Sequence, residues 1–157
     1  MNVLERPSPH HSPRTKPISA IILHDTASQT AESALSWFQA PASKVSAHLV
    51  IDRDGVVYQC VPFDQAAWHA GTSVLHGEEN VNDCSIGIEL VDLTDDPYPD
   101  RQLLELARAT VTLVTAYQIP LNRVVGHQHI AIPPGRKADP GKDFPWYEFL
   151  SRVGRLL

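Results

Sequence analysis

The residues best suited to chemistry lie in residues 126–141, a segment rich in proline and glycine. It carries the imidazoles of His127 and His129 and, further on, Lys137 and Asp139. Proline and glycine disfavour helix and regular strand pairing, so we predict a loop. Imidazole and carboxylate groups are ligands of catalytic zinc, which uses three protein ligands and leaves a fourth position for water. The segment therefore predicts part of a zinc site, with a third ligand from elsewhere.

The third ligand is predicted to be His24, at the end of the apolar run 18–23. Such a run is typical of a buried strand, and a strand end holds a side chain rigidly. His127 is preferred to His129 for the same reason, because it directly follows the predicted strand 122–125. A buried histidine with satisfied hydrogen bonds is the alternative for His24.

Glu89 is a further polar residue in an unusual position, because it lies within the predicted strand 85–91. Successive side chains of a strand point to opposite faces, so Glu89 lies on the face away from Ile86, Ile88 and Leu90. A carboxylate buried there without a partner would cost several kcal/mol. We therefore expect either a salt bridge or a role facing a metal or its water.

The composition is that of one ordinary globular domain. The chain has 157 residues, of which 43% are hydrophobic and 20% charged, and a formal net charge of −5. This charge argues against a nucleic-acid partner, since such domains usually carry a basic surplus. Cys60 and Cys84 are too few for a disulfide framework, and we expect buried thiols rather than a disulfide.

The N-terminal residues 1–17 differ from the rest of the chain. They contain four prolines and three basic residues against one glutamate, which favours a flexible basic arm, or an arm that touches an anionic envelope surface, followed by one domain over residues 18–157. No apolar run approaches the ~20 residues of a membrane span, and no secretory signal is evident. Synthesis and residence in the cytoplasm is the expectation.

The remaining patterns alternate between strands and helices. The order is typical of an α/β domain with a central mixed sheet flanked by helices. An Arg-Asp-Gly turn at 53–55 predicts a hairpin. The predicted strands are 18–23, 47–52, 56–61, 85–91 and 122–125, and the predicted helices are 30–40, 100–119 and 145–157.

These motifs, taken together, resemble those of the type 2 N-acetylmuramoyl-L-alanine amidases, which share a fold with peptidoglycan recognition proteins and phage amidase-type lysozymes. The resemblance extends from about residue 18 to residue 146. It is carried by six ordered blocks: Ile22-Leu23-His24-Asp25-Thr26-Ala27, Val45-Ser46-Ala47-His48, Asp52-Arg53-Asp54-Gly55, Ala67-Trp68-His69-Ala70-Gly71, Asn82 to Leu90, and Gly126-His127 through Gly135-Arg136-Lys137-Ala138-Asp139-Pro140-Gly141.

The resemblance implies a zinc enzyme that hydrolyses the amide bond between N-acetylmuramic acid and L-alanine in peptidoglycan or muropeptides. It implies that His24, His127 and Asp139 bind Zn²⁺, that Glu89 is a general base or orients the water, and that Lys137 stabilises the oxyanion. We expect a monomer. The candidates for substrate binding are His48, Trp68, His69, Asn82 and Arg136, of which Trp68 offers an indole face for stacking.

Three features depart from the family pattern. The loop between His127 and Gly135 is two residues longer than in compact forms, which keeps His129 open as a ligand. Ala47 and Asp139 stand where some phage members have Tyr and Cys, which favours the bacterial recycling enzymes. The N-terminal arm has no counterpart. A peptidoglycan-binding receptor or regulator without catalysis is the alternative function, and a phage or prophage enzyme that lyses intact wall is the alternative to recycling.

Overall fold

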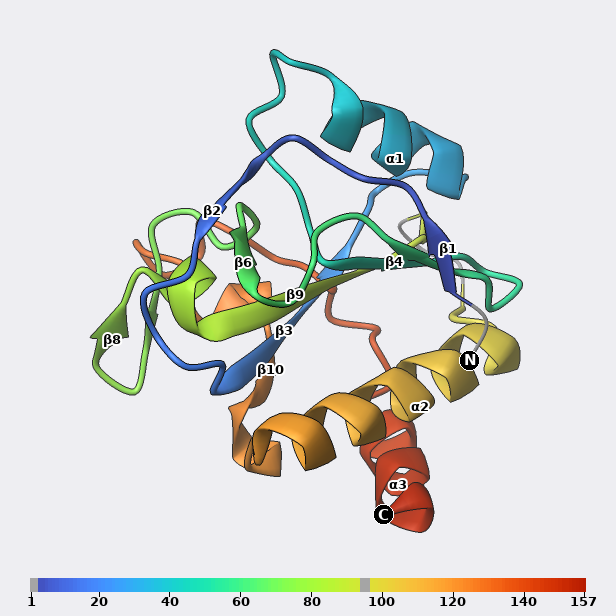
Figure 1. The fold of residues 1–157 in the computed structure, drawn as a ribbon. Coiled ribbons are helices and arrows are strands. Elements are labelled where there is room, and N and C mark those ends of the chain that lie inside the picture. The colour runs from blue at the N-terminus through green and yellow to red at the C-terminus, as the bar shows by residue number, and fades with distance from the viewer. Residues whose placement is uncertain (1–2, 94–96) are drawn as a thin grey trace.

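A mixed β-sheet lies at the centre of the structure, a computed structural model that describes residues 3–93 and 97–157 (Figure 1). Its strand order is β1-β5-β4-β9-β3-β10. Within the described residues, β4 and β5 pair antiparallel and the other neighbours pair parallel, which confirms the predicted mixed sheet. The strands are β1 (Val3–Glu5), β3 (Ala20–Asp25), β4 (Leu49–Ile51), β5 (Val57–Gln59), β9 (Ser85–Leu90) and β10 (Val124–Gly126).

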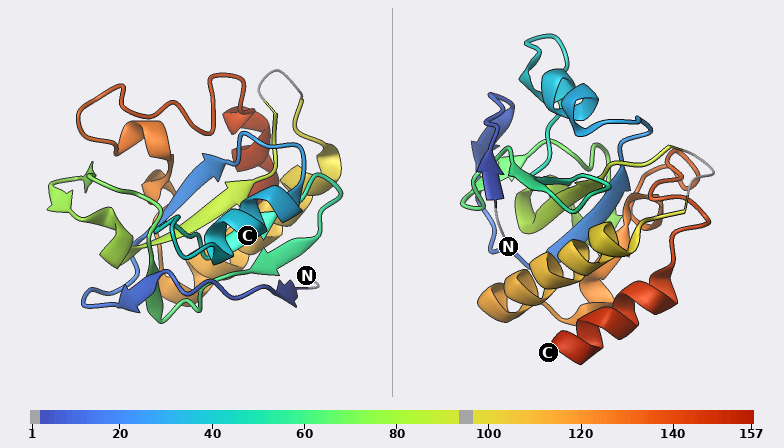
Figure 2. Two further views of the ribbon diagram at one scale, coloured as in Figure 1. Left: turned by 90° about the horizontal axis from the view of Figure 1, so that it is seen from above. Right: turned by 90° about the vertical axis from the view of Figure 1, so that its right-hand side faces the viewer.

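Two helices cover one face of this sheet, and a third lies over the other face (Figure 2). Helices α2 (Asp100–Tyr117) and α3 (Trp146–Leu156) cover the first face, and α1 (Ala31–Gln39) covers the second. All three were predicted from the sequence, and the structure confirms them. The largest core cluster lies between the sheet and α2 and α3; its members include Ile21, Leu23, Ile86, Ile88, Leu90, Leu103, Leu106, Phe149 and Val153.

The opposite face of β3 and β9 carries the polar residues. Ala20 and Ile22 alternate with the first-face residues and pack in a smaller cluster, and His24 continues their row. The layer over this face includes short strands that the periodicity of the sequence did not predict. These are β6 (Gln65–Ala67), β7 (Val74–Leu75) and β8 (Glu78–Glu79), followed by the 3-10 turn η1 (Val81–Cys84).

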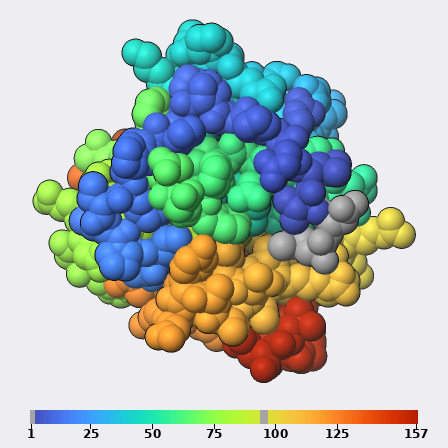
Figure 3. Space-filling model, viewed as in Figure 1, coloured from blue at the N-terminus to red at the C-terminus, as the bar shows by residue number. Residues whose placement is uncertain are grey.

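The N-terminal residues are packed against the domain, so the expected flexible arm is corrected. Strand β1 pairs in parallel with β5 at the sheet edge, and β2 (His11–Pro13) pairs antiparallel with β6. Figure 3 shows this segment lying across the surface between α1 and α2. Met1 and Asn2 of the predicted arm lie outside the described residues. Backbone pairing supplies the order that a composition rich in proline did not indicate.

Arg14 anchors this segment through its guanidinium group, which reaches across to backbone carbonyls of two other segments. A planar guanidinium carries five N–H donors, which suits one side chain to several acceptors. The acceptors are the carbonyl oxygens of Phe63 (3.2 Å), Gln65 (2.8 Å), Asn82 (3.3 Å), Asp83 (2.7 Å) and Ser85 (3.1 Å).

The other two basic side chains of the segment are also engaged. Arg6 forms an ion pair with Glu32 at 2.8 Å, and Lys16 donates to the carbonyl of Glu79 at 3.0 Å. The expected envelope-binding arm therefore lacks the free tether on which it depended. Elsewhere, Cys60 and Cys84 are buried free thiols, as predicted. No helix in the described part of the chain is long and apolar enough to cross a membrane.

Replacement of Arg14 by methionine should lower the free energy of unfolding by about 3 kcal/mol, because partly buried carbonyl groups would lose a charged donor. Urea denaturation followed by circular dichroism measures this change. Arg6→Met is the matched control, since its ion pair is largely exposed and such pairs contribute little. Equally small changes in both variants would show that Arg14 is not the anchor.

Candidate metal centre and catalytic cleft

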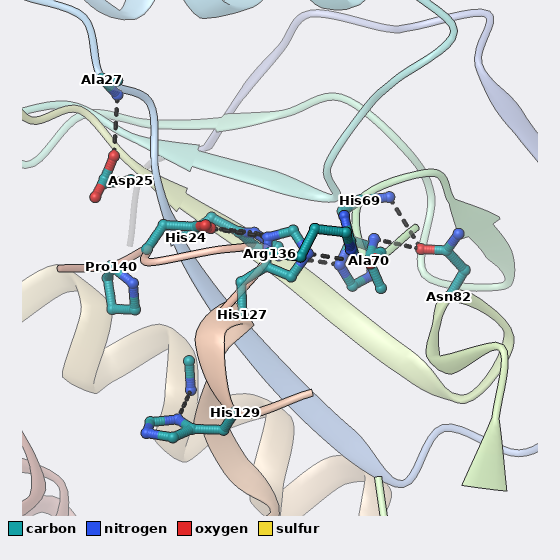
Figure 4. Close-up of polar contacts among 12 residues, drawn as sticks. His24, Asp25, Ala27, His69, Ala70, Asn82, His127, His129, Arg136 and Pro140 are labelled. Atoms are coloured by element: carbon teal, nitrogen blue, oxygen red, sulfur yellow. Dashed lines mark hydrogen bonds and ion pairs between the residues drawn. The ribbon is translucent and has the colours of Figure 1, made fainter. Parts of the chain in front are cut away.

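Three ligand atoms converge at one end of the sheet (Figure 4). The Nδ1 atom of His24 lies 3.1 Å from the Nδ1 atom of His127, and each lies 2.9 Å from Oδ2 of Asp139. Both imidazoles are buried, with 2% and 3% of their residue surface exposed. The structure thus brings together the three residues that the sequence singled out for zinc.

Strand register explains why the two imidazoles meet. Strands β3 and β10 are parallel neighbours in which Leu23 is aligned with Gly126. His24 and His127 are the next residue in each chain segment, so they emerge side by side at the same edge of the sheet. Parallel strands end at a common edge, where α/β folds usually place ligands.

The return of the loop brings Asp139 to the same place. The backbone N–H of Gln128 donates to the carbonyl of Asp139 at 3.0 Å, which joins the two ends of the loop. Gly126 permits this close approach, because a Cβ atom there would lie 2.7 Å from Cδ of Pro140. Gly126 therefore ends strand β10 and also leaves the space into which Pro140 packs.

His129 lies away from this cluster (Figure 4). Its Nδ1 atom accepts a hydrogen bond from the backbone N–H of Gly126 at 3.0 Å, and its ring packs near Trp146, with centroids 5.9 Å apart. The structure places only His127, of these two histidines, with His24 and Asp139. The geometry therefore supports His127 as the ligand.

The donor set fits a bound cation. Nε2 of His127 lies 3.0 Å from the carbonyl oxygen of Ala70, which can only accept, so Nε2 carries the hydrogen and Nδ1 of the neutral ring presents a lone pair. That lone pair faces a carboxylate oxygen, and two acceptors at 2.9 Å repel each other unless a cation lies between them. Burial lowers the pKa of His24, which keeps this imidazole neutral and available to a metal.

Glu89 lies beside the three ligands. It is aligned with His24 in the parallel pair β3 and β9, so the two side chains share the second face. Its buried Oε2 atom has no hydrogen-bond partner among the described residues, which argues against the expected salt bridge. Burial, and then the charges of Asp139 and Asp25, raise the pKa of Glu89 well above its usual value. A carboxyl group with a raised pKa is suited to take up a proton and return it during a reaction.

A cleft of about 500 Å³ opens over these groups. Lys137 contributes an exposed cation to its wall, from the same loop as Asp139. Another part of the wall comes from α1 and the loop that follows it. This wall includes Ala34, Trp37, Phe38, Val45 and Ser46.

Sequence reasoning missed the contribution of α1 to the cleft. Trp37 of α1 is 55% exposed and lines the cleft. A signal was present, because Trp37 lies outside the apolar stripe of Ala31, Ala34, Leu35 and Phe38 on a short helix. A large aromatic residue outside the buried stripe of a helix is a candidate for a binding surface.

Two of the predicted substrate-binding residues serve the scaffold. The prediction that His48 binds substrate is corrected, because this residue is fully buried. Its Nδ1 atom accepts from the backbone N–H of Gly87 at 3.0 Å, and its Nε2 atom lies 3.0 Å from the carbonyl oxygen of Gln65. The guanidinium of Arg136 donates to the carbonyl groups of Ile132, Ala70 and Thr72, at 2.9, 3.1 and 2.7 Å. It joins two loops and also lines a second cleft of about 310 Å³.

The other three candidates line the clefts. Trp68 lies in the wall of the main cleft, and its Nε1–H donates to Oγ of Ser12 at 3.3 Å. Asn82 lines the second cleft and accepts from the backbone N–H groups of His69 and Ala70, at 3.0 and 2.7 Å. His69 lines both clefts, but it is 9% exposed and both of its ring nitrogens have partners within the protein.

Comparison with known proteins agrees with this geometry. The family model of N-acetylmuramoyl-L-alanine amidase (Amidase_2) matches residues 14–142. The 1,6-anhydro-N-acetylmuramyl-L-alanine amidase AmpD of Citrobacter freundii is 38% identical, over 94% of this chain and 88% of that protein. A crystal structure of a selenomethionine derivative of AmpD superposes with a TM-score of 0.87 at 36% identity, covering 96% of this chain and 94% of that one. AmiD from E. coli, solved with the substrate anhydro-N-acetylmuramic acid-L-Ala-D-gamma-Glu-L-Lys, gives a TM-score of 0.78 at 30% identity, covering 86% of this chain and 57% of that one.

Alanine substitutions should distinguish the ligand histidine from its neighbour. We expect one zinc per chain in the parent protein, and loss of zinc in His24→Ala, His127→Ala and Asp139→Ala, because each removes one of the three ligands. His129→Ala is the matched control and should retain the metal. Elemental analysis after dialysis against a weak chelator measures the content. Zinc retained by His127→Ala and lost by His129→Ala would transfer the role to His129.

Proposed function

Since this chain belongs to the N-acetylmuramoyl-L-alanine amidase family and is an amidase of that class, we propose that it is a zinc enzyme that cleaves muropeptides between N-acetylmuramic acid and L-alanine. The observation that carries the proposal is the position of Glu89. Glu89, with a carboxyl oxygen that has no hydrogen-bond partner in the part of the chain that the structure describes, and Lys137 line the same cleft as the three converging ligand residues.

In this proposal His24, His127 and Asp139 hold the zinc ion. When bound, zinc lowers the pKa of a water molecule and polarises the amide carbonyl of the substrate. Burial lowers the pKa of His24, which serves this role because neutral rings bind metal and charged rings do not. Asp139 supplies the one negative charge of the set, which leaves a net positive centre.

Glu89 is the proposed proton carrier. It takes a proton from the attacking water and gives it to the nitrogen of L-alanine as the amide bond breaks, a general base followed by a general acid. Its alignment with His24 holds the carboxyl group next to the ligand set. Its raised pKa suits both steps, since the group must hold a proton between them.

Lys137 is the proposed stabiliser of the oxyanion. Attack on the amide places negative charge on the former carbonyl oxygen, and a positioned cation stabilises that charge. Lys137 lies two residues before Asp139, so the loop that fixes the ligand also fixes the lysine.

The proposed substrate is a soluble muropeptide that carries 1,6-anhydro-N-acetylmuramic acid. The names of AmpD and the complex of AmiD support this class. The cleft also supports it, because the indole groups of Trp37 and Trp68 provide apolar faces near the reacting groups. All residues with a proposed role lie in one chain, so we propose a monomer as the active unit.

The non-catalytic receptor considered from the sequence is not proposed. Such a protein needs the cleft but not the ligand set, whereas this chain brings together His24, His127 and Asp139. It also keeps Glu89 and Lys137 in the wall of the cleft.

Glu89→Gln and Lys137→Met should each retain zinc and the fold but lower kcat by about 100-fold or more, because both act on the transition state. Release of the peptide from anhydro-muropeptide, followed by chromatography, measures the rate. Lys142→Met is the matched control, since Lys142 is exposed and not among the residues that line the cleft. A zinc-loaded Glu89→Gln protein with parental kcat would remove Glu89 from the mechanism.

The substrate class can be tested with two substrates. We expect the parent protein to release peptide from soluble anhydro-muropeptide with a kcat/KM at least tenfold above that for intact sacculi. The products are identified by mass spectrometry, which also shows whether the cleaved bond precedes L-alanine. Faster release from sacculi would favour an enzyme that lyses intact wall.

A further inference from the structure

His69 lines the clefts, and its ring also contacts a metal-ligand candidate. Its Nδ1 atom lies 3.0 Å from Nε2 of His24, the ring nitrogen opposite the one that faces His127 and Asp139. The two rings are nearly perpendicular, with centroids 5.1 Å apart and an interplanar angle of 84°. Figure 4 shows His24, His69 and His127 grouped at this end of the sheet.

The hydrogen-bond partners of His69 determine which ring nitrogens carry hydrogen. Oγ of Ser85 lies 2.6 Å from the carbonyl oxygen of Val81, which can only accept, so the hydroxyl of Ser85 donates there. Nε2 of His69 lies 3.1 Å from the same Oγ atom and therefore donates its N–H to it. In the neutral ring this leaves Nδ1 of His69 as an acceptor.

The direction of these bonds continues to the metal centre. Because Nδ1 of His69 is an acceptor, Nε2 of His24 must carry a hydrogen and donate it to Nδ1 of His69. Nδ1 of His24 then presents a lone pair to the point where Nδ1 of His127 and Oδ2 of Asp139 converge. The carbonyl oxygen of Ala70 accepts from Nε2–H of His127 in the same way, which leaves Nδ1 of His127 with a lone pair.

Gly87 provides the space for the ring of His69. A Cβ atom at Gly87 would lie 2.5 Å from Cγ of His69 and 2.7 Å from its Nδ1 and Cδ2 atoms, closer than real Cβ contacts. Ser85, Gly87 and Glu89 alternate along the second face of β9, opposite Ile86 and Ile88. One strand face thus holds the acceptor for His69, the space for its ring and the carboxyl group of Glu89.

We infer that His69 is a positioning residue for the metal centre, held by Ser85 and Gly87, which fixes the ring orientation of His24 and directs its Nδ1 lone pair to the metal. This inference rests on the proposed zinc site. It gives His69 a role other than the expected substrate binding. Partners of this kind on a ligand histidine typically contribute about 10- to 100-fold to metal affinity.

Substitutions at His69 separate positioning from packing. In His69→Asn the amide oxygen takes the place of Nδ1, so an acceptor for His24 is retained, whereas His69→Leu removes it. We expect zinc affinity to fall about 10- to 100-fold in His69→Leu and by a smaller factor in His69→Asn. Competition with a chromophoric chelator measures the affinity in variants that circular dichroism shows to be folded. Equal affinities for the parent and His69→Leu proteins would overturn the inference.

A readout without metal tests the same inference. Nitrogen-15 NMR of the zinc-free parent protein should show hydrogen on Nε2 of His24 and none on Nδ1. In His69→Leu this preference should weaken, because the acceptor for Nε2–H is lost. The Nδ1–H form of His24 as the main species in the zinc-free parent would contradict the proposed direction of the bonds.

Gly87→Ala provides an independent variant that leaves His69 in the chain. Alanine at this position should displace the ring of His69 and lower zinc affinity by the same order as His69→Leu. Gly154→Ala is the matched control, because a Cβ atom there meets no atom within 4 Å. Parental zinc affinity in a folded Gly87→Ala protein would count against the role of the ring position.

The outcomes also separate this inference from the proposed function. Absence of zinc binding in the parent protein would reject the proposed zinc enzyme itself. Zinc binding in the parent with unchanged affinity in His69→Leu, His69→Asn and Gly87→Ala would leave the zinc enzyme intact and reject only the positioning role.

Discussion

The convergence of two imidazole nitrogens and one carboxylate oxygen is the interaction on which the rest of the site depends. Nδ1 of His24, Nδ1 of His127 and Oδ2 of Asp139 lie within 3.1 Å of one another. Three acceptors at this distance are stable together only with a cation or protons between them. The opposite nitrogen of each ring is therefore as important as the ligand nitrogen, because its hydrogen bond decides which side of the ring faces the metal.

The sheet turns this local requirement into a rigid arrangement. The parallel strands β3, β9 and β10 are neighbours, so His24, Glu89 and His127 reach one edge in register. The apolar face of the same strands packs against α2 and α3, which fixes the strands that carry the polar face. A strand that alternates between isoleucine and Ser85, Gly87 or Glu89 thus contributes to the core and to the site at once.

The second layer, over the polar face, closes the site from the other side. It comes from distant parts of the chain: α1 forms one wall of the cleft, and the segment of Trp68 and His69 forms another. Asn82 holds the backbone of that segment, and Arg14 joins the N-terminal strands to the start of β9. The N-terminal segment therefore belongs to the framework of the cleft rather than to a free tether.

The sequence by itself determined the helices, the mixed sheet with its strands β3, β4, β5, β9 and β10, and the residues that converge, because periodicity and side-chain chemistry are local properties. His24, Glu89 and His127 were found because each stands at the end or on the polar face of an apolar strand. Tertiary structure decided what depends on partners distant in the chain. It paired β1 and β2 with other strands, buried His48, turned His129 away from the cluster and placed His69 between His24 and Ser85. A hydrogen bond between residues 16 or 45 positions apart leaves no periodic signal in a sequence, and only the packed chain shows which nitrogen of a histidine is occupied.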